Sequence, residues 1–364
     1  MTILGESLKW LSCIVLFLTT CIASADDEEL PWAFGGLDWS SDGQYVAVGT
    51  SRGAHIHNSD DLSLFAVFGD GYVDSVAWSN EGLTLAFNDD AQGHIVLRGI
   101  ETGYTAHLLY PTTPSKQEFP ARSIVWSTGD SRIAAGCRCG SIGVWDADQQ
   151  GSGRLINVWP LYSTGTTQID WRPGGVDIMS GSIVNGIAIW NYYMKNLMDF
   201  MWNTYGNNSP ARWSPDGNMI AAGDNPINVW KVKPDRPHTA WDEIGGERIH
   251  RLDYEHGRLL GMDWHPDSSK LAFIVSHHDS TALDFSRDGT LIWDISSDST
   301  TLLPGVFIRD MTNTEKVIEW SPDGRRLAAI SSDGRIVIWD AHTFEIVAEY
   351  AGYRSILDFY KENP

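Results

Sequence analysis

The chain has 364 residues, of which 42% are hydrophobic, and a formal net charge of -21. Single hydrophobic cores stop growing at roughly 250–300 residues, so the length predicts either two domains or a repeat architecture. The acidic balance disfavours nucleic acid as a partner, because a phosphate backbone is bound through Lys and Arg. It indicates a soluble, self-repelling surface or a basic partner.

The N-terminal region has the pattern of an export signal. The apolar run WLSCIVLFLTTCIA has the length of a signal-peptide core and is followed by ASA and then DDEE, with Ala23 and Ala25 at an A-x-A cleavage site. We therefore expect residues 1–25 to be a signal peptide and residues 26–31 an acidic N-terminal segment. The run is short for a membrane span, so the mature protein is expected to be secreted or periplasmic. A lipoprotein anchored at Cys21 and an uncleaved anchor stay open as alternatives.

From residue 39 onward, a Trp followed by a turn recurs along the chain. Each turn contains Pro, Asp, Asn or Gly, and a short apolar run follows it, as YVAVGT does at 45–50 and RLAAIS at 326–331. A second turn leads to a run that often ends in Trp, such as IVIWD at 336–340, and a looser fourth run closes the unit. Each of the seven units therefore predicts four strands.

Twelve of the seventeen tryptophans occupy two positions of this repeat. Strict recurrence favours packing between neighbouring sheets over a sugar-binding or stacking site. Seven follow the first run and five end the third; they are Trp39, Trp78, Trp126, Trp145, Trp171, Trp190, Trp213, Trp230, Trp264, Trp293, Trp320 and Trp339.

The pattern resembles the WD40-repeat β-propeller family. The resemblance is carried by Trp145-Asp146, Trp293-Asp294 and Trp339-Asp340, with SPDG and SSDGRIVIWD around them. The first two repeats depart from it, with His57-Asn58 and Arg98-Gly99 in the Trp-Asp position, and the family's Gly-His pair is essentially missing. The motif WSPDG is also similar to TolB-like periplasmic propellers.

The resemblance implies an all-β fold, a seven-bladed β-propeller of four-stranded antiparallel blades over residues 32–352. Residues 353–364 are expected to be a C-terminal tail or an extra strand. How the ring closes stays open, because WAFGGLDWS already starts a first strand near the N-terminus. A monomer is expected.

The resemblance also implies a top face, which carries the second-to-third strand turns and the loops between blades. The long connections 110–122, 159–167, 202–210 and 276–289 fall on it, and long loops on a rigid scaffold are common binding surfaces. The candidate partner-binding residues are aromatic or imidazole side chains in these loops: Phe119, Tyr162, Trp202, Tyr205 and His278.

Catalytic and metal-binding patterns are weak. GTSRG at 49–53 matches G-x-S-x-G, but Ser51 is expected in a strand-to-strand turn and not in a strand-turn-helix. His55 and His57 share a strand face without a third ligand, and His277, His278 and Asp279 form a candidate metal group in a long loop. No phosphate loop, zinc-finger spacing or dinucleotide fingerprint is present, so no cofactor, catalytic residue or resident metal is predicted.

Two classes of function follow. The first is an exported, non-enzymatic scaffold that binds a protein or peptide partner, of unknown identity, on its top face. The second is an enzyme or small-ligand binder that uses the central channel, which would need a ring of His, Asp, Glu or Arg at matching repeat positions. The first strands end variously as GLDW, SVAW, SIVW, QIDW, PARW, GMDW and VIEW, so the sequence predicts no such ring.

Cys137 and Cys139 are the cysteines that stay after signal removal. In extended chain, residues i and i+2 lie about 6.5 Å apart with parallel side chains, which is the upper end of the Cα separations in disulfides and leaves the Cβ atoms too far apart. We therefore predict that this pair forms no structural disulfide, unless the turn bends tightly or the pair is a redox or metal site.

Overall fold

The computed structural model describes residues 31–89, 91–111, 120–137, 139–147, 153–160, 166–182, 186–191, 196–201, 210–223, 226–232, 247–254, 257–276, 289–305, 316–331 and 333–354. The strands all belong to the unit formed by residues 32–364. The described residues form β-strands and no α-helix, so none of them form a helix able to cross a membrane.

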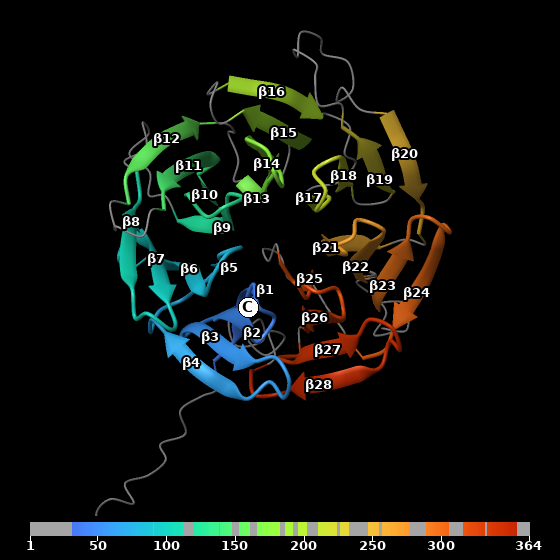
Figure 1. The fold of residues 1–364 in the computed structure, drawn as a ribbon, viewed down its shortest axis with the longest axis horizontal. Coiled ribbons are helices and arrows are strands. Elements are labelled where there is room, and N and C mark those ends of the chain that lie inside the picture. Colours follow the sequence, from blue (N-terminus) through green and yellow to red (C-terminus); the bar gives the residue numbers. More distant parts are fainter. Residues whose placement is uncertain are drawn as a thin grey trace, which may run out of the picture. The chain divides into compact units, whose positions relative to one another are not determined.

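Seven four-stranded antiparallel sheets follow one another along the chain and stand around a ring (Figure 1). This confirms the predicted seven-bladed propeller. The first three blades comprise β1 (Ala33–Trp39), β2 (Tyr45–Thr50), β3 (Gly53–Asn58) and β4 (Leu64–Phe68); β5 (Val76–Trp78), β6 (Thr84–Asp89), β7 (His94–Gly99) and β8 (Thr105–Leu109); and β9 (Ala121–Trp126), β10 (Arg132–Cys137), β11 (Ser141–Asp146) and β12 (Leu155–Pro160).

The same order continues through the remaining four blades. Blade 4 comprises β13 (Thr166–Trp171), β14 (Asp177–Ser182), β15 (Gly186–Asn191) and β16 (Asn196–Met201); blade 5 comprises β17 (Ala211–Trp213), β18 (Met219–Ala222), β19 (Ile227–Lys231) and β20 (Glu247–Leu252); blade 6 comprises β21 (Arg258–Trp264), β22 (Lys270–Ser276), β23 (Gly289–Asp294) and β24 (Ser299–Leu303); and blade 7 comprises β25 (Ile318–Trp320), β26 (Arg326–Ile330), β27 (Ile336–Asp340) and β28 (Ile346–Tyr350).

The first strand of every blade is innermost and the fourth is outermost (Figure 1). Because the strands are antiparallel, the tight turns that follow the first-strand Trp share one face, which we call the bottom face. The second-to-third strand turns and the interblade connections share the other, the top face. First-strand side chains thus line the centre of the ring.

The turns after the first-strand Trp, which read SPDG in blades 5 and 7, explain why the chain reverses there. In blade 7, the hydroxyl of Ser321 donates to Asp323 Oδ1 at 2.7 Å and accepts from the amide of Arg326 at 2.9 Å. Gly324 has a φ of 70°, a left-handed conformation that favours glycine, and Gly43 and Gly217 have φ values of 70° and 68° in the matching turns.

The hydrophobic core is divided among the seven interblade junctions. Each of the seven core clusters joins side chains of two neighbouring blades, and the cluster between blades 7 and 1 has the same construction as the others. Trp145, Trp293 and Trp339 are fully buried, Trp190 and Trp230 are partly buried, and the seven first-strand tryptophans are at most 8% exposed.

The ring closes without a shared strand, because β1–β4 and β25–β28 are each continuous in sequence. The Leu37 amide donates to the carbonyl of Lys316 at 2.7 Å. Beyond β28, the buried side chain of Tyr353 packs in the cluster between blades 7 and 1. The first residues of the predicted C-terminal tail therefore pack against both blade 7 and blade 1.

Candidate functional site

The residue directly before each first-strand Trp is charged in five of the seven blades, and these five side chains form a cluster in the centre of the ring. They are Asp38, Asp170, Arg212, Asp263 and Glu319. The prediction that the channel carries no such ring was therefore wrong. The repeated feature is a charged residue at the same position, which is acidic in four blades and basic in one. A search for one repeated residue type therefore does not find it.

Three aspartates of the ring bind the backbone of the next blade. Asp38 accepts a hydrogen bond from the Trp78 amide at 2.6 Å. Asp170 accepts from the Trp213 amide at 2.7 Å, and Asp263 accepts from the Trp320 amide at 2.8 Å. A first strand is the inner edge of its sheet, so these amides have no strand partner of their own. Each aspartate therefore joins its blade to the following one.

Where the preceding blade has another residue at this position, the link commonly runs through the indole. Trp39 Nε1 donates to the Glu319 carbonyl at 3.1 Å, and Trp126 Nε1 donates to the Ala77 carbonyl at 3.0 Å. Trp264 Nε1 donates to the Arg212 carbonyl at 3.2 Å. The fourth case, Trp171, donates instead to Gly175 in its own turn at 3.4 Å.

The two kinds of link between blades, aspartate to Trp amide and Trp indole to carbonyl, exclude each other. Among the described residues, the indole nitrogens of the three tryptophans whose amides bind an aspartate have no hydrogen-bond partner; they are Trp78, Trp213 and Trp320. Within the described part of the chain, six of the seven junctions thus use either the aspartate or the indole, and the junction between blades 3 and 4 is the exception. Arg172 lies 5.2 Å from the ring of Trp213, and Arg326 lies 5.1 Å from that of Trp39, which adds cation–π contacts between blades.

Lys316 enters the channel from the segment before β25. Its Nζ lies 3.4 Å from Asp38 Oδ1 and 3.2 Å from Glu319 Oε1. It reaches blade 1 past Gly36, where an added Cβ would lie 2.9 Å from the Lys316 Cβ. Lys316 therefore neutralises charge at the junction where the last blade meets the first.

The cluster holds four carboxylates and two cations in a partly dehydrated space. Burial raises the pKa of Asp170 and raises that of Asp263 to about 6, while the Arg212 guanidinium opposes both shifts. Burial also raises the pKa of Glu319. Burial alone would lower the pKa of Lys316, but the carboxylates of Asp38 and Glu319 outweigh it and raise that pKa. Charges on neighbouring blades therefore influence the pKa values of Asp170, Asp263 and Glu319.

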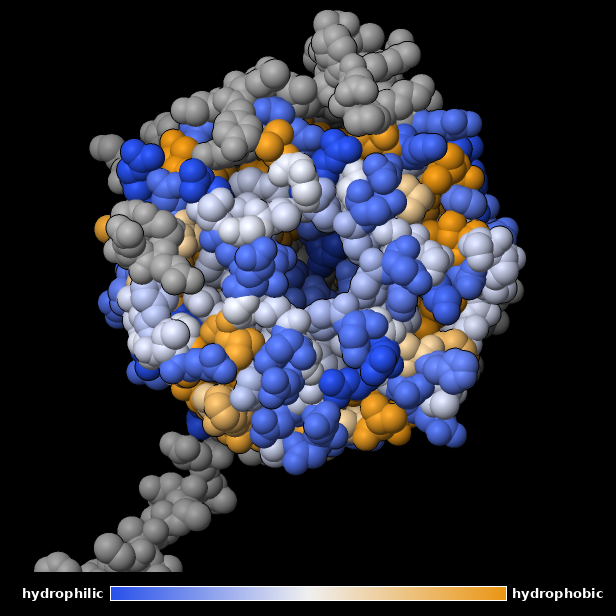
Figure 2. Space-filling model, viewed as in Figure 1, coloured by the Kyte–Doolittle hydropathy of each residue, from blue (hydrophilic) through white to orange (hydrophobic). Residues whose placement is uncertain are grey.

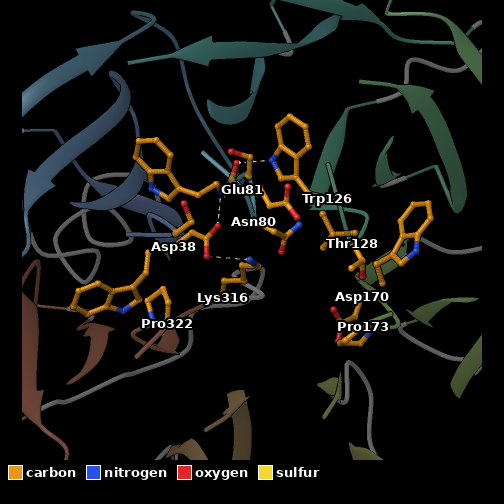
Figure 3. Close-up of a pocket in the computed structure, with 17 residues that line it drawn as sticks. Asp38, Asn80, Glu81, Trp126, Thr128, Asp170, Pro173, Lys316 and Pro322 are labelled. Atoms are coloured by element: carbon orange, nitrogen blue, oxygen red, sulfur yellow. Dashed lines mark hydrogen bonds and ion pairs between the residues drawn. The ribbon is translucent and has the colours of Figure 1, made fainter. Parts of the chain in front are cut away.

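A cavity of about 510 Å³ opens on the bottom face beside this cluster. Figure 2 shows a central opening with hydrophilic residues in its depth. In Figure 3, Lys316 lies beside Asp38, while Asp170 and Pro173 stand apart from them on another part of the wall. First-strand tryptophans, the Asn80-Glu81 turn and Pro322 also line the cavity. The cavity is wide enough for a small polar molecule or a side chain of a partner.

Comparison with known proteins agrees with this architecture. The family described as "WD domain, G-beta repeat" matches residues 310–340, in blade 7. The WD repeat-containing protein slp1 of Schizosaccharomyces pombe is 24% identical over 307 residues, which are 83% of this chain and 57% of slp1. The resemblance to WD40-repeat proteins is confirmed.

Two further similarities support the WD40-repeat fold. Actin-interacting protein 1-2 of Arabidopsis thaliana is 23% identical over 196 residues, or 53% of this chain and 29% of that protein. A chain in the structure of a mitotic checkpoint complex superposes with a TM-score of 0.65 at 22% identity, covering 84% of this chain and 86% of that one. The chain thus spans only part of the curated relatives, and the structural likeness shows the fold alone.

The candidate partner-binding residues of this propeller lie outside the described residues. They are Phe119, Tyr162, Trp202, Tyr205 and His278. The same holds for the candidate metal group of His277, His278 and Asp279 and for the proposed signal peptide. In the described part of the chain, no three His, Cys, Asp or Glu side chains converge as metal ligands.

Three other singled-out side chains have structural partners. His57 Nε2 lies 2.6 Å from the Tyr353 hydroxyl, and His55 Nδ1 lies 3.2 Å from the same oxygen. Burial lowers the pKa of His55 to about 4 and lowers that of His57. Ser51 lies between β2 and β3, where its hydroxyl accepts from the Trp32 amide at 3.1 Å. Its surroundings are those of a strand-to-strand turn, as expected.

The prediction for the cysteines was wrong, because Cys137 and Cys139 form a disulfide. Their Cα atoms are 5.1 Å apart, less than the separation in extended chain. The reason is that β10 ends at Cys137 and the chain turns at once, with the Gly140 amide donating to the Cys137 carbonyl at 3.1 Å. The tight bend, which the prediction named as its exception, brings the two sulfurs together.

Proposed function

We propose that this protein is an exported, non-enzymatic scaffold that binds a protein or peptide partner through the loops of its top face. The similarity to WD-repeat proteins supports it, since one relative is named for its interaction with actin and one similar chain comes from a multiprotein complex. The proposed contact residues are Phe119, Tyr162, Trp202, Tyr205 and His278.

The observation that carries the proposal is that the charged groups in the channel bind neighbouring blades and one another. Asp38, Asp170 and Asp263 hold the amides of neighbouring blades, and Lys316 joins Asp38 to Glu319. Groups engaged in this way stiffen a hub, and a rigid hub is what a set of binding loops needs.

A small-ligand binder is the second candidate, and the cavity of about 510 Å³ favours it. Asp170 lines this cavity, and burial raises its pKa. A cationic ligand would relieve the excess of carboxylates there. The two candidates place binding on opposite faces of the propeller, so they can be separated by variants.

The experiment is partner capture by the affinity-tagged full-length protein in extracts of its native cell envelope, followed by quantitative mass spectrometry. We expect a combined Tyr162→Ala, Trp202→Ala and Tyr205→Ala variant to lose the captured partner. A bottom-face control, Glu81→Ala with Pro173→Ala, should retain it. If the control loses the partner and the loop variant keeps it, binding uses the bottom face and the proposal is wrong.

Export is tested separately by the intact mass of the processed protein. We expect a chain that begins at Asp26, after the A-x-A site at Ala23 and Ala25. A lipidated start at Cys21, or a retained Met1, would contradict soluble export while leaving the scaffold proposal to the capture experiment.

A further inference from the structure

The Cys137–Cys139 disulfide spans the second-to-third strand turn of blade 3, on the top face. Blade 7 builds the matching turn without cysteines: Ser331 and Asp333 occupy the two positions. There the Gly334 amide donates to the Ser331 carbonyl at 3.0 Å, as the Gly140 amide donates to the Cys137 carbonyl at 3.1 Å. The glycine φ values, 85° and 78°, also agree. The turn therefore forms without a disulfide.

The disulfide also contributes little to folding by constraining the unfolded chain. The cysteines are separated by two positions in sequence, and the loop-closure entropy removed by a cross-link is smallest for the shortest loops. A cross-link that the turn does not require and that hardly restricts the unfolded chain calls for another role.

The two sulfurs have different surroundings. Cys137 is fully buried, and its Sγ faces the amides of Cys139 at 3.1 Å and Ser141 at 3.3 Å. Cys139 is only half-buried. Amide donors stabilise a thiolate and lower the pKa of its thiol, and a thiol of low pKa is the better leaving group in disulfide exchange. An incoming thiol can therefore reach Cys139, while Cys137 is suited to leave.

We propose that Cys137–Cys139 is an exchangeable redox disulfide that reacts with thiols of a small molecule or a partner protein. The incoming thiolate attacks Sγ of Cys139 and forms a mixed disulfide. The Cys137–Cys139 bond breaks, and its electron pair passes to Cys137 Sγ, which leaves as a thiolate held by the two amides. A second thiol then attacks the incoming group's sulfur and releases Cys139, so that two thiols are oxidised to one disulfide and the pair is reduced.

This activity is separate from the proposed scaffold function. Its first test is the rate at which dithiothreitol reduces the disulfide in the full-length protein carrying Cys13→Ser and Cys21→Ser, followed by thiol alkylation and mass spectrometry. We expect reduction at least about tenfold faster than that of glutathione disulfide under the same conditions, because the leaving thiol is stabilised. Reduction as slow as that of glutathione disulfide, or slower, would overturn the proposal. So would a pair that stays as two free thiols in glutathione disulfide.

The assignment of the two roles is tested in single variants of the same background. With Cys139→Ser, the thiolate absorbance of Cys137 near 240 nm should titrate below the ordinary cysteine pKa of about 8.5. With Cys137→Ser, Cys139 should accumulate a stable mixed disulfide with glutathione. A Cys137 titration at or above the ordinary value contradicts the leaving-group role, and an unreactive Cys139 contradicts the attack site.

The double variant Cys137→Ser with Cys139→Ser decides between a redox and a structural disulfide. We expect its thermal midpoint to stay within a few degrees of the parent, because blade 7 forms the same turn with Ser331 and Asp333. A large drop in the midpoint would show that the disulfide is structural, and the proposal would fail.

Discussion

A single residue position, the one before the first-strand Trp, decides how adjacent blades are joined. An aspartate there accepts the next blade's Trp amide, as Asp38 does for Trp78. Where another residue stands there, the carbonyl commonly accepts the indole N–H instead, as that of Ala77 does from Trp126. Because a buried amide without a partner is costly, substitutions at this position should act on the following blade.

Asp263 predicts a particular dependence of stability on pH. Its folded-state pKa is raised from 3.8 to about 6, so the native protein holds this proton more tightly than the unfolded chain does. The stability contributed by the proton is fully present below pH 3.8 and is lost as the pH rises through about 6. Asp263→Asn keeps an oxygen acceptor for the Trp320 amide but has no charge.

We therefore expect the Asp263→Asn variant to gain stability relative to the wild type as the pH rises across this interval. Urea unfolding at several pH values measures the difference. Subtracting the two curves removes the titration of groups that do not interact with Asp263, such as His55, whose lowered pKa makes the protein lose stability as the pH falls. A difference that is independent of pH would contradict the raised pKa of Asp263.

Gly36 predicts a steric effect at the junction of the last and first blades. An alanine Cβ at Gly36 would lie 2.9 Å from the Cβ of Lys316 and 3.3 Å from its carbonyl oxygen. We expect Gly36→Ala to destabilise the protein by about 1–3 kcal/mol. Gly71→Ala is the matched control, because no atom lies within 4 Å of its added Cβ. Equal unfolding free energies for the two variants would refute the close approach of Lys316.

At the scale of elements, the C-terminal segment after β28 joins blade 7 to blade 1. Tyr353 is 4% exposed, and its hydroxyl contacts His57 Nε2 at 2.6 Å and His55 Nδ1 at 3.2 Å. The rings of Tyr350 and Tyr353 pack with their centroids 5.1 Å apart. The segment thus adds hydrogen bonds to the apolar cluster at this junction.

Tyr353→Phe should lower the free energy of unfolding by about 1–3 kcal/mol, because it leaves buried imidazole nitrogens without their hydroxyl partner. Tyr350→Phe is the control: its ring contacts Tyr353, but its hydroxyl makes no hydrogen bond among the described residues. Thermal unfolding of both variants measures the effect. If both lose the same stability, the hydroxyl of Tyr353 has no special role.

The strands were predictable because their alternation and turn residues recur seven times. The run YVAVGT is β2 (Tyr45–Thr50) and IVIWD is β27 (Ile336–Asp340), with unchanged bounds. The predicted run at 62–68 begins as a strand only at Leu64, because Leu62 adopts a φ of 55° in the preceding turn. Local pattern fixes such elements to within two residues.

The channel cluster and the disulfide could not be predicted, because the sequence pattern does not give the spatial neighbours of a residue or the local bend of the chain. The charged ring needs the spatial neighbour of each position, which lies about one repeat away in sequence, as Trp213 lies 43 residues from Asp170. The disulfide needs the bend at the end of β10, where extended geometry no longer applies. The sequence carried one usable signal, namely a charged residue before Trp in five of seven units.

At the scale of the whole molecule, the propeller is a ring whose seven junctions must all hold at once. Each junction combines an apolar cluster with polar links at the inner strands, and the closing junction uses Lys316 in addition. With a net charge of -21, the chain repels itself, and neutralisation of carboxylates at the hub opposes that repulsion. The channel is therefore built chiefly to hold blades together.

The most direct test of this claim is amide hydrogen exchange at Trp213 in Asp170→Ala, with Asp170→Asn as the matched variant. The Trp213 amide faces away from its own sheet and binds the Asp170 carboxylate at 2.7 Å. We predict that its exchange accelerates about tenfold or more in Asp170→Ala, that Asp170→Asn largely preserves protection, and that the Trp78 and Trp320 amides stay protected in both. A Trp213 amide that is as well protected in Asp170→Ala as in the wild type would contradict the claim that the channel carboxylates join the blades.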